Sequence, residues 1–128
     1  MFSIMFSIII PLYNKAEYIK NTIECVLAQT IDSFELIIVD DGSTDNGTTI
    51  VSNVQDERVK LIRQENAGVS AARNRGIQEA KGKYICFLDA DDTWEMDFLQ
   101  TVKELFEKFP EAGMACPSYQ VSYGDRIV

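Results

Sequence analysis

The chain of 128 residues contains no histidine. This absence excludes His-ligated zinc sites and any mechanism that needs an imidazole base, so the available acid–base chemistry is that of carboxylates. Cysteine is scarce as well: Cys25, Cys86 and Cys116 are widely spaced, lie among apolar neighbours and form no CxxC pair. We therefore expect buried, unreactive thiols in a reducing compartment, which favours a cytoplasmic protein.

Basic residues are also few. The chain has 12 Lys and Arg against 20 Asp and Glu, a net charge of -8. This is the wrong sign for a phosphate backbone and argues against general nucleic-acid binding. An anionic ligand would need local help from a metal ion, a helix N-terminus or a few placed arginines.

Long apolar runs are missing too. A membrane-spanning helix needs ~20 apolar residues in a row, whereas the apolar N-terminal stretch MFSIMFSIII is closed by Pro11. It has neither a basic leader nor a small-residue cleavage site, so it does not resemble a signal peptide. We predict a buried strand there and a soluble chain.

What the sequence does contain is an alternation of strand-like and helix-like segments. Short, continuously apolar runs predict strands buried on both faces, at residues 7–13, 34–40, 59–64, 83–89 and 113–121. Helical periodicity and breaker residues predict helices at 15–29, 45–54 and 69–81 and in the stretch that Pro110 ends. The alternation predicts one domain of the Rossmann-like α/β class, a mostly parallel sheet flanked by helices.

Polar clusters follow four of the predicted strands: PLYN, DDGSTD, ENAGVS and DADD. The carboxyl ends of parallel strands lie at one edge of a sheet, and ligands bind there, where the strand order reverses. The four clusters together therefore predict a ligand site.

Two of the three acids in the DADD cluster, Asp89 and Asp91, stand at alternate positions. Alternate side chains of an extended segment share a face, so both carboxylates can point at Mg²⁺ or Mn²⁺ shared with a diphosphate. The alternative is a solvated loop in which Asp91 or Asp92 caps a helix beginning near Thr93. Capping by Asp92 and metal binding by Asp91 are compatible.

The DDGSTD cluster begins with Asp40 and Asp41. Turn and capping residues explain positions 42–45, but they do not explain two adjacent acids at a strand end. Such a carboxylate can accept hydrogen bonds from a base N–H or a ribose hydroxyl.

In ENAGVSAARNRGI, Gly68 precedes a helix that carries Arg73 and Arg75. A helix N-terminus and a guanidinium make an anion site, although an ordinary helix whose arginines form surface ion pairs is the simpler interpretation of this segment taken alone. Tyr13 is placed to stack on a flat base or to serve plain packing.

In order and spacing, the segments SIIIPLYN, FELIIVDDGSTD, ENAGVSAARNRGI and YICFLDADD resemble the inverting glycosyltransferases of family 2, which have the GT-A fold. The resemblance covers residues 7 to about 120. It implies that residues 1–128 are the N-terminal nucleotide-sugar-binding part of a larger, metal-dependent enzyme. The donor it implies is a nucleotide-diphospho-sugar, most often a UDP-sugar.

The resemblance also implies roles for individual residues. Pro11, Tyr13 and Asp41 would hold the uridine, with Asp40 alongside, and Arg73 would lie near the base or the diphosphate.

Asp89 and Asp91 match the first and last acids of the family's DXD motif. Asp89 would face the ribose and diphosphate, and Asp91 would bind Mg²⁺ or Mn²⁺. The cation would offset the repulsion between the carboxylates and the charge that develops on the leaving diphosphate.

One family feature is missing. An inverting displacement needs a base on the face opposite the leaving group, and no acid after Asp92 has the family's context for it. We expect the base and the elements for a glycan or lipid-linked acceptor beyond Val128, in a full protein placed at the inner face of the membrane. We expect this chain to bind donor without transferring sugar, and to self-associate through an exposed edge or apolar face.

Two other functions fit an acidic α/β chain of this length. A Mg²⁺-dependent receiver domain needs its acid pair after the first strand and a lysine after the fifth, whereas here the pair follows the second strand. A sugar-phosphate nucleotidyltransferase needs a glycine-rich basic loop after the first strand, and PLYNKAEY has no glycine.

Overall fold

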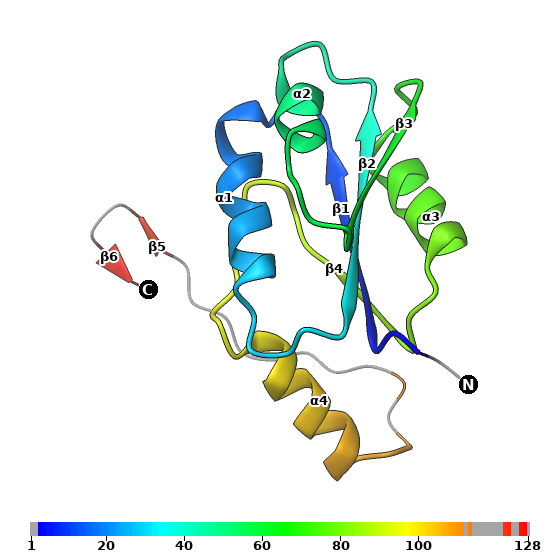
Figure 1. The fold of residues 1–128 in the computed structure, drawn as a ribbon, viewed down its shortest axis with the longest axis vertical. Helices are drawn as coiled ribbons and strands as arrows, with labels where there is room; N and C mark the ends of the chain where they lie inside the picture. Colours follow the sequence, from blue (N-terminus) through cyan, green and yellow to red (C-terminus); the bar gives the residue numbers. More distant parts are fainter. Residues whose placement is uncertain (1–2, 112, 114–121, 124–125, 128) are drawn as a thin grey trace.

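The computed structural model describes residues 3–111, 113, 122–123 and 126–127, in which a four-stranded sheet lies between helices (Figure 1). The strands of this sheet are β1 (Phe6–Leu12), β2 (Phe34–Asp41), β3 (Val59–Gln64) and β4 (Tyr84–Phe87). The helices are α1 (Ala16–Leu27), α2 (Gly47–Ser52), α3 (Val69–Glu79) and α4 (Phe98–Lys108). Two short strands, β5 (Ser122–Tyr123) and β6 (Arg126–Ile127), form a separate antiparallel pair. The predicted α/β class is confirmed.

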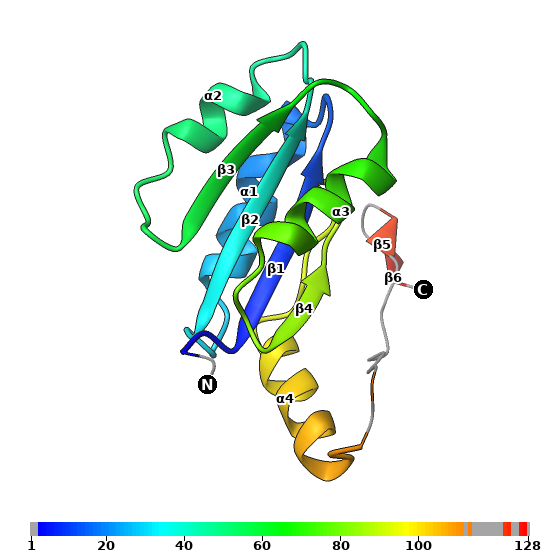
Figure 2. The same ribbon diagram turned by 90° about the vertical axis from the view of Figure 1, so that its right-hand side faces the viewer.

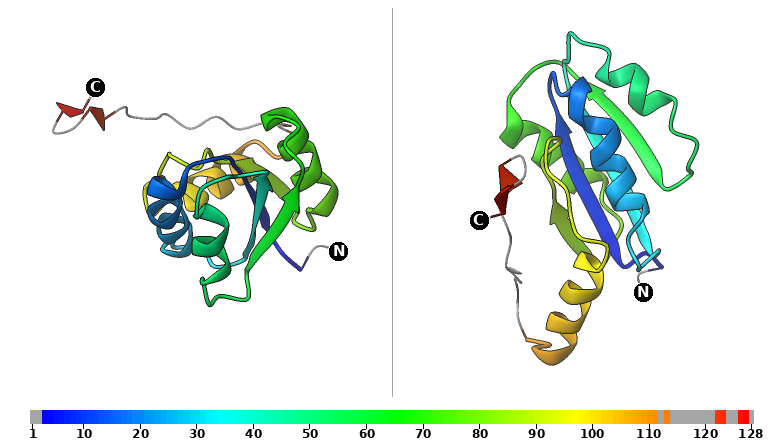
Figure 3. Two further views of the ribbon diagram at one scale, coloured as in Figure 1. Left: turned by 90° about the horizontal axis from the view of Figure 1, so that it is seen from above. Right: turned by 90° about the vertical axis from the view of Figure 1, so that its left-hand side faces the viewer.

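The strand order is β3-β2-β1-β4, and every neighbouring pair is parallel. The chain therefore builds outward from β1 to β2 and β3, then returns to place β4 on the other side of β1. Helices α1 and α2 cover one face of the sheet and α3 covers the other (Figures 2 and 3). The strand order thus reverses between β1 and β4, which is where α/β sheets bind ligands.

The central strands carry the core. Every residue of β2, and all of β1 except Pro11, is buried because helices cover both faces. Ile8 and Ile10 belong to the larger core that includes α1, while Ile9 packs with Ala72 of α3. The prediction of strands buried on both faces is confirmed for β1 and β2. It is wrong for β3 and β4, whose residues are all half-buried or exposed, because these are the edge strands of the sheet.

Helix α3 lies close to the sheet because it has a glycine at the contact. A Cβ added to Gly76 would lie 2.5 Å from Cγ2 of Ile9, which is fully buried. The small residue therefore sets how near α3 approaches β1.

The beginning of α4 differs from the sequence-based alternative of a helix near Thr93. The helix begins at Phe98, below the sheet at the amino ends of the strands (Figure 1). The backbone N–H of Leu99, in the first turn of α4, donates to the Gln29 side-chain oxygen at 3.0 Å. A side chain distant in the sequence thus accepts one of the N–H groups that a helix N-terminus leaves without an intrahelical partner. Asp92 does not cap it.

Three further predictions concern local features. Helix α2 has Asn46 at its N-cap position rather than Ser43, Thr44 or Asp45, although Asp45 accepts the Gly47 N–H at 3.0 Å. The predicted strand at 113–121 lies outside the described residues apart from position 113. No helix among the described residues is long and apolar enough to cross a membrane.

The thiols are consistent with an unreactive role. Cys25 and Cys86 are partly buried, and burial raises the pKa of Cys86 to about 12. Cys116 lies outside the described residues.

Candidate functional site at the carboxyl ends of the strands

A cavity of about 430 Å³ lies at the carboxyl ends of β1 and β4, where the strand order reverses. All four polar clusters of the sequence contribute to its wall. The lining residues are Pro11, Tyr13, Lys15, Asp41, Asn66, Gly68, Val69, Asp89, Ala90 and Asp91.

The turn between β1 and α1 is fixed by the turn that follows β2. Asn14 has a φ of 50°, and its side-chain oxygen accepts the N–H of Thr44 at 2.7 Å. In return, the Asp45 carboxylate accepts the Ala16 N–H at 3.0 Å. This reciprocal clamp holds the backbone on both sides of Lys15, while Tyr13 stays 47% exposed at the cavity.

Asp41 is buried at the end of β2 and organises the loop between β3 and α3. One oxygen accepts the Gln64 side-chain N–H at 2.9 Å and the Ala67 N–H at 2.8 Å. The other accepts the Gly68 N–H at 3.0 Å and the Asn66 side-chain N–H at 3.3 Å. Burial by itself raises the pKa of Asp41, but these hydrogen bonds outweigh it and hold the pKa below its usual value.

Gly68 completes that loop. Its φ is 99°, a conformation that favours glycine, and its N–H reaches Asp41 from that position. The cavity wall next to α3 is therefore built around the Asp41 carboxylate.

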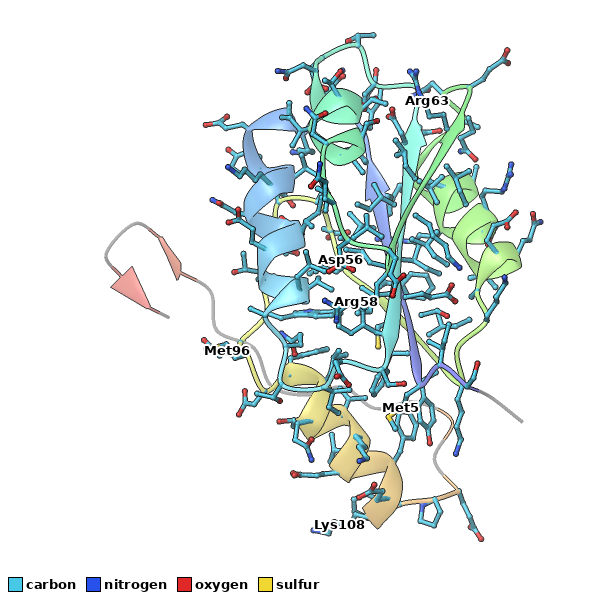
Figure 4. All side chains as sticks on the ribbon, in the orientation of Figure 1. Met5, Asp56, Arg58, Arg63, Met96 and Lys108 are labelled. Atoms are coloured by element: carbon cyan, nitrogen blue, oxygen red, sulfur yellow. The ribbon has the colours of Figure 1, made fainter. Side chains whose placement is uncertain are left out.

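Asp40 is fully buried and does not line the cavity. It accepts hydrogen bonds from the Ser43 N–H and the Thr48 hydroxyl. Its oxygen also lies 3.4 Å from the Arg63 guanidinium, at the carboxyl end of the sheet (Figure 4). Burial raises the pKa of Asp40, but these hydrogen bonds and the Arg63 charge outweigh it and lower the pKa.

Asp89 and Asp91 face the cavity from the loop after β4, and each has a basic partner. Asp91 lies 3.3 Å from the Lys15 ammonium, and Asp89 lies 3.3 Å from the Arg73 guanidinium. The Asp91 side chain remains 41% exposed and the Asp89 side chain 54% exposed, so both carboxylates are accessible to a ligand.

The loop that carries these acids is fastened to α1. The buried Thr22 hydroxyl lies 2.6 Å from the Ala90 carbonyl oxygen and 3.0 Å from that of Asp92. Further along, the Gln29 side chain donates to the Glu95 carbonyl at 2.7 Å. The acids therefore stand on a backbone that α1 positions.

Negative charge in this loop is only partly offset. Desolvation raises the pKa of Asp92, and the charges of Asp89 and Asp91 raise it further. A divalent cation fits such a place, since hard cations prefer carboxylate oxygens. The described residues hold no cluster of three or more metal-ligating side chains, so water or ligand oxygens would complete the shell, as Mg²⁺ commonly requires.

Arg73 stands beside the cavity rather than in its wall. Its guanidinium carbon lies 6.0 Å from the centre of the Phe87 ring, and one terminal nitrogen meets Asp89. Its Nε is buried and has no hydrogen-bond partner among the described residues. The arginine is therefore placed to act on a ligand mainly through Asp89.

A larger cavity of about 560 Å³ lies between α1 and α2, away from the strand ends. Its wall combines apolar side chains such as Ile23, Leu27 and Ile50 with Lys20 and Asp56. It gathers none of the four polar clusters, so its size alone does not make it a candidate site.

Sequence reasoning alone did not select Lys15 or Thr22. Lys15 follows PLYN directly, so its position next to a strand-end cluster was an available signal. Nothing in the sequence around Thr22 indicates that its hydroxyl binds a loop 68 residues away.

Relatives of the chain are named as glycosyltransferases and as teichoic or teichuronic acid biosynthesis proteins. An uncharacterized glycosyltransferase of Nostoc sp. is 41% identical over 111 residues, covering 84% of this chain and 34% of that protein. The minor teichoic acid biosynthesis protein GgaA of Bacillus subtilis is 43% identical over 110 residues, covering 80% and 25%. The chain thus spans about a third of the first relative's length and a quarter of the second's.

Solved structures share the fold. S. aureus TarS in complex with UDP has a TM-score of 0.79 and 25% identity, covering 90% of this chain and 38% of that one. Mannosyltransferase PcManGT of Pyrobaculum calidifontis, in complex with GDP-Man and Mn²⁺, has a TM-score of 0.74 and 26% identity, covering 79% and 32%.

The sequence model of glycosyl transferase family 2 matches residues 7–127, nearly the whole chain. With the parallel sheet, the shared fold and the strand-end cavity, this match shows that the chain belongs to glycosyl transferase family 2.

Proposed function

We propose that this chain is the donor-binding part of a metal-dependent inverting glycosyltransferase, and that its donor is a UDP-sugar. The observation that carries the proposal is the single cavity that Tyr13, Asp41, Asp89 and Asp91 share at the switch point of the sheet. TarS has been solved with UDP and with UDP-GlcNAc, which supports a uridine nucleotide.

In this proposal each part of the cavity holds one part of the donor. The half-exposed Tyr13 ring stacks on the base beside Pro11, and Asp41 with its loop forms the opposite wall. Asp40 does not touch the donor in this proposal. It fixes the turn after β2, since its carboxylate accepts hydrogen bonds from Ser43 and Thr48.

The diphosphate lies over the loop after β4. Asp89 and Asp91 would hold Mg²⁺ or Mn²⁺ together with the diphosphate, and Arg73 orients Asp89. When bound, the cation supplies positive charge at the leaving diphosphate. PcManGT was solved with GDP-Man and Mn²⁺, which supports a divalent ion in this fold.

The base for an inverting transfer is not among the cavity residues. None of the described acids after Asp92 lines the cavity, and Asp125 lies outside the described residues. We therefore propose that residues 1–128 bind donor but do not transfer sugar. GgaA is named a teichoic acid biosynthesis protein, which supports a glycan or lipid-linked acceptor for the whole enzyme.

Calorimetric titration tests the binding. UDP should bind in the presence of Mn²⁺, and Asp91→Asn should weaken that binding at least about tenfold. Even the mutation of a residue that only hydrogen-bonds to a metal ligand commonly lowers metal affinity by that factor. Asp97→Asn is the matched control, since Asp97 is the N-cap residue of α4 and its side chain makes no capping hydrogen bond. GDP binding in preference to UDP would contradict the choice of nucleotide, and sugar transfer by the chain alone would contradict the missing base.

A further inference from the structure

Lys15 is the one basic residue among those that line the cavity, all of which the structure describes. Its ammonium lies 3.3 Å from the Asp91 carboxylate, which is the acid proposed to bind the cation. In this structure, therefore, a lysine supplies positive charge to the very carboxylate that a divalent ion would use.

The backbone of Lys15 is fixed whereas its side chain is not. Its carbonyl accepts the N–H groups of Tyr18 and Ile19, both at 3.0 Å, and the residue stands at the N-cap of α1. The neighbouring N–H of Ala16 is held by Asp45. The Lys15 side chain remains 43% exposed, so its ammonium can change position while its backbone stays fixed.

The pair with Asp91 is weak enough to exchange. Exposed ion pairs contribute little, because water screens them and two long side chains must be held in one geometry. A divalent ion between Asp89 and Asp91 carries twice the charge of an ammonium and meets two carboxylates instead of one. The ion should therefore displace Lys15 from Asp91.

We propose that Lys15 exchanges partners during donor binding, a step that rests on the proposed function. Without a cation, Lys15 neutralises Asp91. When the cation binds Asp91, the released ammonium moves within the same cavity to the diphosphate oxygens. A lysine ammonium donates strong, charge-assisted hydrogen bonds to such oxygens. The competition sets the order, because metal binding frees the lysine that then binds the diphosphate.

Arg73 does not fill this role. Its guanidinium meets Asp89 and lies against the Phe87 ring, and it stands outside the residues that line the cavity. Lys15 is therefore the residue that both lines the cavity and pairs with a carboxylate from which a cation can displace it.

Two titrations of the 128-residue chain test the exchange. Lys15→Met should bind Mn²⁺ alone about two- to fivefold more tightly, the factor that an exposed ion pair supports. The same variant should bind UDP at saturating Mn²⁺ at least about tenfold more weakly, because a charged hydrogen bond is lost. Lys15→Arg should stay within a few-fold of the unmodified chain in both titrations.

Lys20→Met is the matched control, because it removes the same charge from an exposed position of α1 that faces the other cavity. Urea denaturation of each variant checks that it is folded. If Lys15→Met equals Lys20→Met in either titration, or weakens Mn²⁺ binding, partner exchange is wrong. If the unmodified chain binds no UDP with Mn²⁺, the proposed function fails instead, and the Mn²⁺ titration still tests the Lys15–Asp91 competition.

Discussion

At the scale of single residues, β2 carries buried carboxylates at both of its ends. Asp40 and Asp41 stand at the carboxyl end, and Glu35 stands at the amino end with 1% of its surface exposed. Glu35 accepts the Ser7 hydroxyl and the Lys81 N–H, both at 2.6 Å, and meets the Lys60 ammonium at 2.8 Å. Each buried acid is thus stabilised as a carboxylate by several donors.

Glu35 should make the stability of the chain depend on pH. Burial raises its pKa, but the hydrogen bonds from Lys60, Ser7 and Lys81 outweigh it and lower the pKa below the ordinary value of 4.5. The unfolded chain then takes up the proton first as the pH falls, so this stabilisation is present above pH 4.5 and is lost below it. Asp40 and Asp41, whose pKa values are also lowered, should add to the same trend.

Urea denaturation between pH 7 and pH 3 measures this dependence. Glu35→Gln should lower the free energy of unfolding by about 1–3 kcal/mol at pH 7, because buried donors lose a charged acceptor. The difference from the unmodified chain should shrink toward pH 3. Glu57→Gln, at an exposed position, should change neither the free energy of unfolding at pH 7 nor its dependence on pH. A constant Glu35→Gln difference across the pH range would show that the charge of Glu35 has no part in stability.

At the scale of elements, the loop after β4 is part of the site because α1 holds it. Thr22→Val keeps the shape of the side chain but removes the hydroxyl that binds the Ala90 carbonyl. We expect a loss of about 1–3 kcal/mol in the free energy of unfolding and weaker binding of UDP with Mn²⁺. Thr101→Val, on α4 and away from the cavity, is the control for the Thr to Val change.

The two effects of Thr22→Val are separable. Stability is measured by denaturation, and binding is measured by calorimetry at a temperature where both variants are folded. Unchanged UDP affinity in a destabilised Thr22→Val variant would mean that the loop keeps its geometry without α1.

At the scale of the whole molecule, much of the architecture could be predicted from the sequence. Continuous apolar runs alternating with helical periods define parallel strands, and parallel strands bring their polar ends together whatever the details of packing. This is why residues from all four clusters, including Tyr13, Asp41 and Asp91, line one cavity.

The details that could not be predicted depend on side-chain direction and distant partners. Asp40 and Asp41 are adjacent on a strand and so point to opposite faces, but the sequence does not say which one faces the ligand. The beginning of α4 at Phe98 depends on a hydrogen bond from Leu99 to Gln29, 70 residues away. Lys15 directly follows the PLYN cluster, but only the fold shows that its ammonium lies 3.3 Å from Asp91.

Self-association remains a prediction of the whole molecule. Among the described residues, β4 pairs only with β1, and its Ile85 and Phe87 side chains are 42% and 46% exposed. An apolar strand with a free edge favours pairing with a second copy. Sedimentation velocity should therefore show association that rises with concentration, and Ile85→Lys should reduce it.

Met96→Lys is the control, because Met96 is 61% exposed on the loop before α4 and points outward (Figure 4). Equal association of Ile85→Lys and Met96→Lys would exclude the β4 edge as the contact.

The central claim is that one cavity, at the ends of β1 and β4, binds the cation and the nucleotide together. Broadening of backbone amide NMR signals by Mn²⁺ in the presence of UDP locates the ion directly, because paramagnetic broadening falls steeply with distance. We predict that the signals of Tyr13, Gly68 and Asp91 broaden first, while those of Lys20 and Asp56 beside the larger cavity persist. Broadening centred on Lys20 and Asp56, or spread evenly over the chain, would contradict the claim.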